Sequence, residues 1–328
     1  MKKNDLKTKL IYSYDLQIDK LKSDFESTNE VSKKANIQTR INFFLDKKQA
    51  AIDKSFDVDE FIGCLTITTG NYKGGVGKTA NTILLAYSLA KLGFKVLVAD
   101  LDPQSNSTKT LMLTKDKVSP DSSLTINKTI MKGIEDGDLT DLPVEIMDNL
   151  YLLPSYIDFT GFTKFLYKNT DSEDEEYTYL EKLFEPFKEE YDFILIDTPP
   201  MNIEISNNAV NMSDFVLISL QTQESSLTGA EDFIDKLIEM KQTYNPKLEV
   251  LGVLPVLLNS EASVDKYILD QAKNMWGDYV FESVVPQMER IKRFYINGIT
   301  NNDRHDQRVL DKYKEITSEF LEKTLELI

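Results

Sequence analysis

The chain has 328 residues, of which 41% are hydrophobic and 28% charged, and its formal net charge is −16. These values are ordinary for a globular protein that buries one large α/β core plus an appendage. No apolar run approaches the roughly 18 residues of a membrane span, and no apolar stretch follows the N-terminus, so we expect a cytoplasmic protein. The single cysteine, Cys64, excludes an internal disulfide.

The first 62 residues differ from the rest in being nearly neutral, with 12 Lys and Arg against 11 Asp and Glu. Within residues 6–25, apolar side chains recur every three or four positions, which predicts one face of a helix. They are Leu10, Tyr14, Ile18, Leu21 and Phe25. This face packs either on the core of its own chain or on a second subunit as a dimerisation helix. We therefore predict a small helical N-terminal domain over residues 1–62, ahead of a larger domain over residues 63–328.

Residues 28–46 resemble a helix-turn-helix, with Ala35 as the small residue at the helix contact and Asn36 in the turn. The following residues would then begin a recognition helix whose side chains reach base edges. The candidate DNA contacts in this segment are Lys33, Lys34, Gln38 and Arg40. An ordinary cap of two helices explains the pattern equally well.

The run from Tyr72 to Thr79 reads Tyr-Lys-Gly-Gly-Val-Gly-Lys-Thr and predicts a phosphate-binding loop. Its glycines let backbone N–H groups turn inward around phosphate oxygens, and the following helix offers its positive end. Residues 65–69 predict the strand before the loop, and residues 80–91 predict the helix after it. Lys78 would reach the outer phosphates, and the Thr79 hydroxyl would ligate Mg²⁺. The predicted nucleotide-binding residues are Gly74, Gly75, Val76, Gly77, Lys78, Thr79 and Ala80.

Two further predicted strands, at residues 94–99 and 191–196, end in acidic residues. Asp100 and Asp102 follow the first strand, and Asp197 follows the second. Because an open parallel sheet binds its ligand at the carboxyl ends of its strands, we expect these carboxylates beside the phosphate loop. Mg²⁺ favours oxygen ligands and keeps several waters, and a carboxylate near the terminal phosphate can orient an attacking water. The predicted metal site consists of Thr79, Asp102 and Asp197.

These segments resemble the ParA/MinD family of ATPases, which have a deviant phosphate loop with an additional signature lysine. The signature elements correspond here to residues 72–79, 100–107 and 194–200. Further matching segments lie at residues 149–155, 213–218, 223–227, 251–259 and 284–286. The resemblance implies a doubly wound, mostly parallel α/β sheet that binds ATP with Mg²⁺ and hydrolyses it, with Asn259 and Pro286 holding the adenine base. One departure is Ser105, where the family more often has glycine.

In this family two subunits close face to face around two ATP molecules. The resemblance therefore implies a homodimer in which Lys73 reaches the phosphates bound by the partner, Lys78 acts within its own subunit and Asp102 acts on the water. Its catalytic residues would be Lys73, Lys78 and Asp102. Similarity to plasmid-partition ParA proteins further implies non-specific DNA binding, association with the nucleoid and a ParB-type adaptor that stimulates hydrolysis. A helix-turn-helix ahead of the ATPase would add operator binding and autorepression.

Net charge argues against broad nucleic-acid affinity, since duplex binding depends largely on Lys and Arg and the isoelectric point is about 4.7. Residues 286–314 nevertheless carry seven basic residues against four acidic ones. ParA proteins bind DNA mainly through basic residues in the C-terminal part of the dimer, so the resemblance nominates Arg290, Lys292 and Arg293. Solvated charges on a helix face are the alternative.

The composition of the C-terminal tail helps to distinguish a partition ATPase from a membrane-cycling ATPase and from a tyrosine kinase. Residues 309–328 have an apolar face, but their polar face is rich in glutamate, whereas a helix on anionic lipid favours Lys and Arg. We therefore expect the tail to pack on the sheet, which disfavours a MinD-like membrane-cycling or protein-positioning ATPase. A tyrosine kinase built on the same loop would have a tyrosine-rich C-terminus, and only Tyr313 lies in the last 30 residues. The acidic tract at residues 171–176 predicts an exposed loop.

Overall fold

The computed structural model describes residues 1–54, 62–120, 126–200, 202–259 and 262–328. Its centre is an eight-stranded sheet with the strand order β3-β4-β2-β5-β1-β6-β7-β8. All neighbouring strands run parallel except the antiparallel pair of β3 and β4. The strands are β1 (Leu65–Gly70), β2 (Val96–Asp100), β3 (Val144–Met147), β4 (Leu150–Leu153), β5 (Phe193–Asp197), β6 (Phe215–Gln221), β7 (Glu249–Leu258) and β8 (Val285–Pro286).

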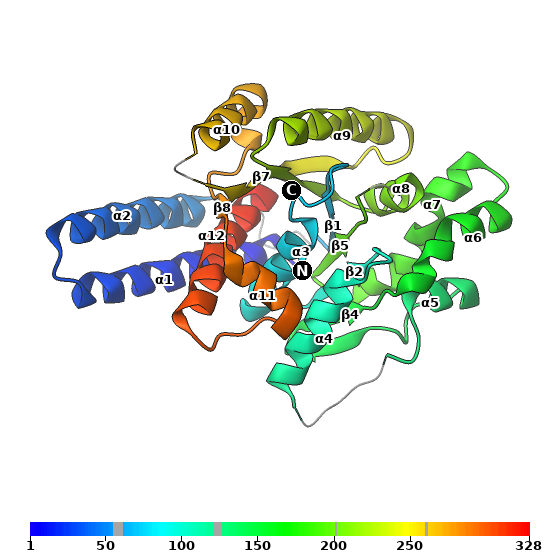
Figure 1. Ribbon diagram of the computed structural model, residues 1–328, viewed down its shortest axis with the longest axis horizontal. Coiled ribbons are helices and arrows are strands. Elements are labelled where there is room, and N and C mark those ends of the chain that lie inside the picture. The colour runs from blue at the N-terminus through cyan, green and yellow to red at the C-terminus, as the bar shows by residue number, and fades with distance from the viewer. Residues whose placement is uncertain (55–61, 121–125, 201, 260–261) are drawn as a thin grey trace.

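Helices cover both faces of this sheet, as Figure 1 shows, and the predicted doubly wound α/β fold is confirmed. One face carries α3 (Lys78–Lys91), α4 (Asn106–Val118), α11 (Glu289–Asn297) and α12 (Arg304–Leu327). The other carries α5 (Ile130–Asp136), α6 (Phe162–Asn169), α7 (Glu173–Phe184), α8 (Ile203–Asn211), α9 (Glu224–Thr243) and α10 (Ser263–Trp276). Single 3₁₀ turns lie at Ile157–Gly161, Glu185–Glu189 and Gly277–Tyr279.

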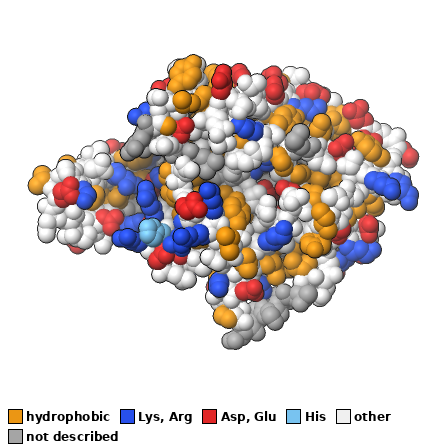
Figure 2. Space-filling view, viewed as in Figure 1, with side chains coloured by type: hydrophobic (Ala, Val, Ile, Leu, Met, Phe, Trp, Pro, Cys, Tyr) orange, Lys and Arg blue, Asp and Glu red, His pale blue; other side chains and the backbone are white. Residues whose placement is uncertain are grey.

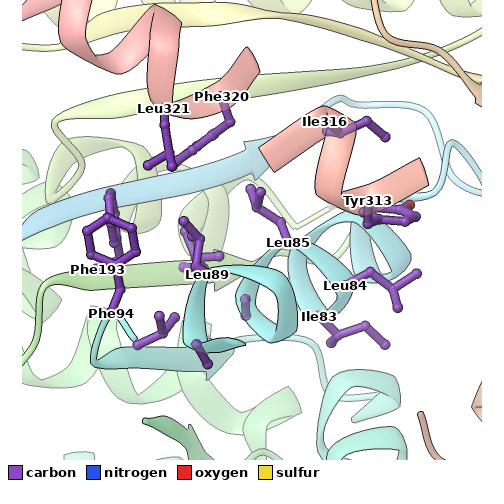
Figure 3. Packing of buried hydrophobic residues seen from close by; sticks show 14 of the residues in the cluster. Ile83, Leu84, Leu85, Leu89, Phe94, Phe193, Tyr313, Ile316, Phe320 and Leu321 are labelled. Carbon is purple, nitrogen blue, oxygen red and sulfur yellow. The ribbon is translucent and has the colours of Figure 1, made fainter. Parts of the chain in front are cut away.

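The central strands are apolar along their whole length because both of their faces are covered. In β2, Val96 and Val98 join the core beneath α3 and α12, whereas Leu97 and Ala99 join the core on the opposite face. This division follows from the two-residue period of a strand, which sends successive side chains to opposite sides. Figure 3 shows the first of these cores, which contains side chains of α12 and α3 together with Phe193 of β5.

The C-terminal helix α12 lies inside the protein, as the sequence predicted. Its apolar face is buried against α3, β7 and the N-terminal helix α1 (Lys3–Ser27). Phe320 and Leu321 are fully buried, and Tyr313 is 1% exposed. The helix therefore offers no apolar face to a lipid surface. Within the described part of the chain, no helix is both long and apolar enough to traverse a bilayer.

The N-terminal residues form a helical hairpin of α1 and α2 (Val31–Asp53), which extends from one side of the molecule in Figure 1. Leu10, Tyr14 and Ile18 of α1 are at most 3% exposed and belong to the same core as α3 and α12. The predicted apolar face of residues 6–25 thus packs on the protein's own core. Residues 55–61, beside the proposed domain boundary at residue 62, lie outside the described part of the chain.

The predicted helix-turn-helix at residues 28–46 is wrong in its central feature. Asn36 lies inside the continuous helix α2, and Ala35 is exposed instead of packed at a helix contact. The segment contains neither glycine nor proline, so nothing in it interrupts the backbone hydrogen bonds of the helix. The chain reverses earlier, between Ser27 and Val31, where it joins α1 to α2.

The acidic tract at residues 171–176 is also not a loop. Glu173 to Glu176 form the first turn of α7, and the Ser172 side chain accepts a hydrogen bond from the Glu175 N–H group. Negative side chains are stabilised at a helix N-terminus by its exposed N–H groups and macrodipole. The cluster of carboxylates therefore begins a helix.

Candidate nucleotide site and basic surface

Three adjacent strands bring the predicted site residues to one edge of the sheet. Asp100 at the end of β2 pairs in register with Asp197 at the end of β5, and Asp197 pairs with Thr69 near the end of β1. The phosphate loop leaves β1 directly after these positions and enters α3 at Lys78. Because the strands run parallel, their carboxyl ends lie side by side, and the aspartates meet the loop as predicted.

The loop has the backbone geometry that its glycines allow. Gly75 has a φ of 76° and Gly77 a φ of 80°, both in the left-handed region that side chains with a Cβ avoid. Val76 between them is fully buried, so it anchors the loop while Gly74 and Gly75 stay exposed. Gly77 then serves as the N-cap of α3, and the first N–H groups of a helix have no carbonyl partner within that helix, so such a terminus can bind an anion.

Lys78 lies folded across its own loop. Its ammonium group donates to the carbonyl oxygens of Asn71 and Lys73, at 3.0 and 3.2 Å from Nζ. Burial lowers the pKa of Lys78, and the negative charges of Asp197 and Asp102 oppose that shift. The ammonium is thus held in the loop by carbonyls that phosphate oxygens can replace, facing both carboxylates.

The two strand-end aspartates use their oxygens differently. Both carboxylate oxygens of Asp100 accept hydrogen bonds within the protein. Oδ1 accepts from the Asp102 N–H at 3.0 Å, and Oδ2 accepts from the Thr108 N–H and hydroxyl at 2.8 and 2.7 Å. Asp197 accepts from the Ser107 hydroxyl at Oδ2, 2.7 Å away, while its Oδ1 is buried without a hydrogen-bond partner among the described residues. Burial raises the pKa of both carboxyls, since it disfavours their charged forms.

This geometry fits ATP with Mg²⁺. The free Oδ1 of Asp197 lies in a buried site that also receives the Thr79 side chain, and a water bound to a cation would satisfy it. Asp102 is 8% exposed, and its Oδ1 accepts from the Gln104 N–H at 2.9 Å, which holds the carboxylate at the mouth of the site. The set thus contains a glycine-rich loop, a lysine, a hydroxyl and two carboxylates.

Comparison with known proteins gives the same result. Residues 64–250 match the AAA_31 family, described as an AAA domain. The ParA chromosome-partitioning protein of Myxococcus xanthus is 31% identical over 231 residues, which cover 69% of this chain and 76% of that protein. The chromosome-partitioning ATPase Soj of Thermus thermophilus is 30% identical over 226 residues, covering 69% and 82% of the two chains. The chain belongs to the ParA/MinD family of ATPases.

Solved structures of low sequence identity share the fold. An ATP complex of a McdA variant from Cyanothece superposes with a TM-score of 0.67 at 21% identity, covering 79% of this chain and 97% of that one. A plasmid partition protein from Borrelia burgdorferi, bound to AMPPNP, has a TM-score of 0.64 at 22% identity and covers 81% and 100%. Both likenesses cover a larger share of the chain than the family match over residues 64–250 does.

The signature lysine of the ParA/MinD family, Lys73, lies on its own subunit here. Its ammonium donates to Gln223 Oε1 at 3.0 Å and to the Ser225 hydroxyl at 2.6 Å, at the start of α9. Both contacts are exposed and both partners are neutral. Such hydrogen bonds each contribute only about 1 kcal/mol net, so the side chain is free to exchange them for a more favourable anionic partner.

The predicted adenine-binding residues lie together at the far end of the same edge. Asn259 directly follows β7, and Pro286 lies in β8, where it pairs with Leu258. Asn259 is exposed, and its backbone N–H donates to Asp265 Oδ2 at 2.6 Å. Contact of either residue with adenine stays a prediction.

Several residues that the sequence did not single out contribute to the site. Ser107 binds Asp197 directly, and it lies within the segment that carries the second family signature. Tyr295 of α11 reaches the site from a distant part of the chain, because its hydroxyl accepts from the Ala80 N–H group. Burial raises the pKa of Tyr295, and the charge of Asp197 adds to the shift. No local pattern marks this tyrosine in the sequence, since only the packing of α11 brings it there.

Ser105, the departure from the family pattern, occupies a position that suits glycine. Its φ of 53° and ψ of 40° place it in the left-handed region at the N-cap of α4. For a residue with a Cβ this conformation costs about 1–2 kcal/mol. The physical reason for glycine at this position is therefore visible in the backbone.

The C-terminal basic candidates lie on α11 but differ in availability. Arg290 pairs with Asp303 at 2.6 Å and with Asp306 at 3.3 Å, and its side chain is only 18% exposed, which assigns it to holding α11 against α12. Lys292 is exposed beside Glu289, its ion-pair partner at 3.1 Å. Arg293 is exposed, and no ion pair of it is seen among the described residues.

Further basic residues from α12 extend this surface. A concave region of about 320 Å³ between the two helices is lined by Arg290, Arg293, His305 and Arg308, together with Gln287, Met288, Glu289 and Val309. In Figure 2, Lys and Arg side chains gather around the single histidine on this side of the molecule. His305 and Arg308 were not among the predicted DNA contacts, and they line this surface together with Arg293.

The N-terminal DNA candidates are engaged in contacts within the chain. Lys33 pairs with Glu30 at 2.6 Å, and the Lys34 ammonium lies 4.9 Å from the centre of the Phe25 ring. Gln38 donates to Asn42 at 3.0 Å within the same helix, and Arg40 pairs with Glu315 of α12. Since they sit along one continuous helix, these four residues do not form the tip of a recognition helix.

Proposed function

We propose that this chain is a partition ATPase in which ATP closes a homodimer, the dimer binds DNA without sequence preference, and hydrolysis stimulated by a ParB-type adaptor releases it. The observation that carries the proposal is the deviant phosphate loop, with Lys73, Lys78, Asp102 and Asp197 at one edge of the sheet. The identity of about 30% to a chromosome-partitioning ATPase supports the same reading.

The position of Lys73 supports a role for ATP in dimerisation. Its ammonium is exposed and, among the described residues, bonds to Gln223 and Ser225, so a triphosphate on a facing subunit would be a stronger partner. A ligand that the closed dimer binds better than the open monomer shifts the equilibrium toward the dimer. ADP lacks the terminal phosphate, and hydrolysis therefore weakens the association.

The placement of α11 supports a connection between the nucleotide and DNA. One side of this helix carries Tyr295, which contacts the start of α3 near Asp197. The opposite side exposes Arg293, which is two residues before Tyr295 in the helix. A change at the phosphates can therefore move the basic surface through one short helix.

The deciding experiment measures DNA binding without nucleotide, with ADP and with ATP, at stated salt concentrations. Random and upstream-promoter fragments are compared, together with vesicles of anionic lipid. The proposal requires binding that appears with ATP, ignores sequence and weakens steeply as salt rises, because counterions are released from the phosphates. Equal binding in all nucleotide states contradicts it, as does lipid binding without DNA binding. Preference for the upstream fragment would add autorepression of its own operon.

Charge reversal then locates the DNA surface. The triple variant Lys292→Glu, Arg293→Glu and Arg308→Glu should weaken ATP-dependent DNA binding at least about tenfold and lower the salt slope by about one per lost phosphate contact. Arg290 is left intact because it pairs with Asp303 and Asp306. The matched control is Lys33→Glu in the N-terminal hairpin, which should bind as wild type. If the control weakens binding and the triple variant does not, the DNA surface belongs to the hairpin.

A further inference from the structure

A chain of buried hydrogen bonds runs from the C-terminal helix to the phosphate loop. The Tyr313 hydroxyl of α12 donates to Asn81 Oδ1 of α3 at 2.7 Å. The Asn81 amide donates to the Ser219 hydroxyl of β6 at 2.9 Å, and Ser219 in turn donates to the Val76 carbonyl. All four residues are at most 1% exposed. Figure 3 shows Tyr313 on α12 facing the turns of α3 that follow the loop.

The direction of this chain is set by the Val76 carbonyl, which can only accept a hydrogen bond, and the chain is completed at its other end by Tyr313. Because the Tyr313 hydroxyl donates to Asn81 Oδ1, the amide N–H₂ of Asn81 must face Ser219. Ser219 then accepts from Asn81, and its own proton is left for Val76. If the amide were reversed, the Ser219 hydroxyl would donate its hydrogen bond to Asn81, and the Val76 carbonyl would lose its donor. Only the observed arrangement satisfies every group.

The Val76 carbonyl matters because it belongs to the peptide unit that carries the Gly77 N–H group. In a planar trans peptide, the C=O and N–H bonds point in opposite directions. Holding the Val76 carbonyl toward the sheet therefore turns the Gly77 N–H away from it, toward the phosphate side of the loop. Gly75 and Gly77 leave the loop with little conformational restraint of its own, so an external anchor has a large effect.

A second contact fixes the same part of the loop. The Asn71 amide donates to the Ser219 backbone carbonyl at 2.8 Å, and Asn71 Oδ1 accepts from the Lys73 N–H at 2.9 Å. Ser219 thus anchors the loop near its beginning through its backbone and near its end through its hydroxyl. Tyr313 acts on the second anchor alone.

We propose that Tyr313 is a positioning residue of the nucleotide site, which orients the Gly77 N–H group through Asn81, Ser219 and Val76. The residue lies 235 positions after Lys78 in the sequence and does not touch the phosphates. ADP and ATP both place phosphate oxygens in the loop, so the effect applies to both nucleotides.

The test is Tyr313→Phe, which removes the hydroxyl and keeps the ring. We expect the dissociation constants for ATP and ADP to rise about fivefold to tenfold, because the buried Asn81 Oδ1 loses its donor and the Asn81 amide is no longer held firmly against Ser219. The KM for ATP should rise by a similar factor while kcat changes less than twofold, since Asp102 and Asp197 are untouched. The matched control is Thr324→Val, which deletes a fully buried hydroxyl of α12 whose one hydrogen bond within the described part of the chain goes to the Phe320 carbonyl.

A purely structural role would give a different result. Thr324→Val should lower the unfolding midpoint as Tyr313→Phe does, yet leave both dissociation constants at wild-type values. Ser219→Ala should weaken binding at least as much as Tyr313→Phe, and combining the two should add no further loss, because both break one chain. Wild-type affinity in Tyr313→Phe, or additive losses in the double variant, would overturn the proposal. If Tyr313→Phe does not fold, Asn81→Leu breaks the chain from α3, and wild-type nucleotide affinity in that variant has the same meaning.

Discussion

At the scale of single residues, the site combines predictable side chains with partners that no local pattern reveals. Lys78, Thr79 and Asp197 were all predicted from the sequence. The spacing of the glycines indicates the first two residues, and the end of a predicted strand indicates Asp197. The partners of these residues were not. Asp197 is held by Ser107, and Lys78 rests on the carbonyls of Asn71 and Lys73.

Lys78→Ala tests the nucleotide site itself. The variant should lose ATP affinity by about 100-fold or more, since a charge-assisted contact to the phosphates worth roughly 3 kcal/mol disappears. The measurement is the dissociation constant for ATP, together with the rise in unfolding midpoint that ATP produces. Lys91→Ala, at the other end of the same helix, is the control and should bind ATP normally. ATP affinity unchanged in Lys78→Ala would contradict the site assignment.

At the scale of elements, the periodicity of apolar residues predicted the positions of helices and strands. It was less informative about which surface each element packs against. The apolar face of α1 was recognised, but its spacing fits packing on the core and packing on a second subunit equally well. Likewise, residues 28–46 resemble a helix-turn-helix in sequence, but they contain no glycine or proline that would end a helix. The structure decides both cases through α12, which covers the apolar face of α1 and pairs with Arg40 of α2.

Leu10→Ala tests whether α1 belongs to the core. Leu10 is 2% exposed, so truncation should lower the free energy of unfolding by about 2–4 kcal/mol. Tyr12→Ala, on the same helix but 51% exposed, should change it by less than about 0.5 kcal/mol. Both values come from urea unfolding at two protein concentrations. A midpoint that depends on protein concentration, with Tyr12→Ala the more harmful change, would make α1 a dimer contact.

At the scale of the whole molecule, the proposed cycle depends on a second subunit. Asp102→Ala should lower kcat at least about 100-fold, as expected for loss of a residue that orients the attacking water, and should accumulate ATP-bound dimers. Adding Lys73→Ala should return the protein to monomers, because the partner's triphosphate loses its counter-charge. Light scattering with ATP and with ADP measures both states.

The control for this experiment is Lys109→Ala in the Asp102→Ala background. Lys109 is an exposed lysine near the site that donates to the Gln104 carbonyl, so its removal should leave the ATP-bound dimer intact. Dimers of undiminished strength in the Lys73→Ala, Asp102→Ala protein would show that Lys73 serves only its own subunit. In that case the contacts of Lys73 with Gln223 and Ser225 are its function.

The α/β class, the phosphate loop and the carboxylates at the strand ends could all be predicted from the sequence. Each of these depends on short-range causes: the two-residue period of a strand, the free backbone of glycine, and the meeting of parallel strand ends at one edge. Even the conformation of Ser105 follows this logic, since the family places glycine where the backbone is left-handed.

Which charges are available for binding, and which residues support the loop, depend instead on how distant segments pack together. The sequence does not distinguish Arg290 from Arg293 as a DNA contact. In the structure, Arg290 is paired with Asp303 and Asp306. Tyr313 and Asn81 are 232 residues apart, and their hydrogen bond exists only because α12 packs on α3. Side chains that meet through the packing of distant helices show no periodic pattern in the sequence. Strands and glycine-dependent turns do, because their causes lie within a few neighbouring residues.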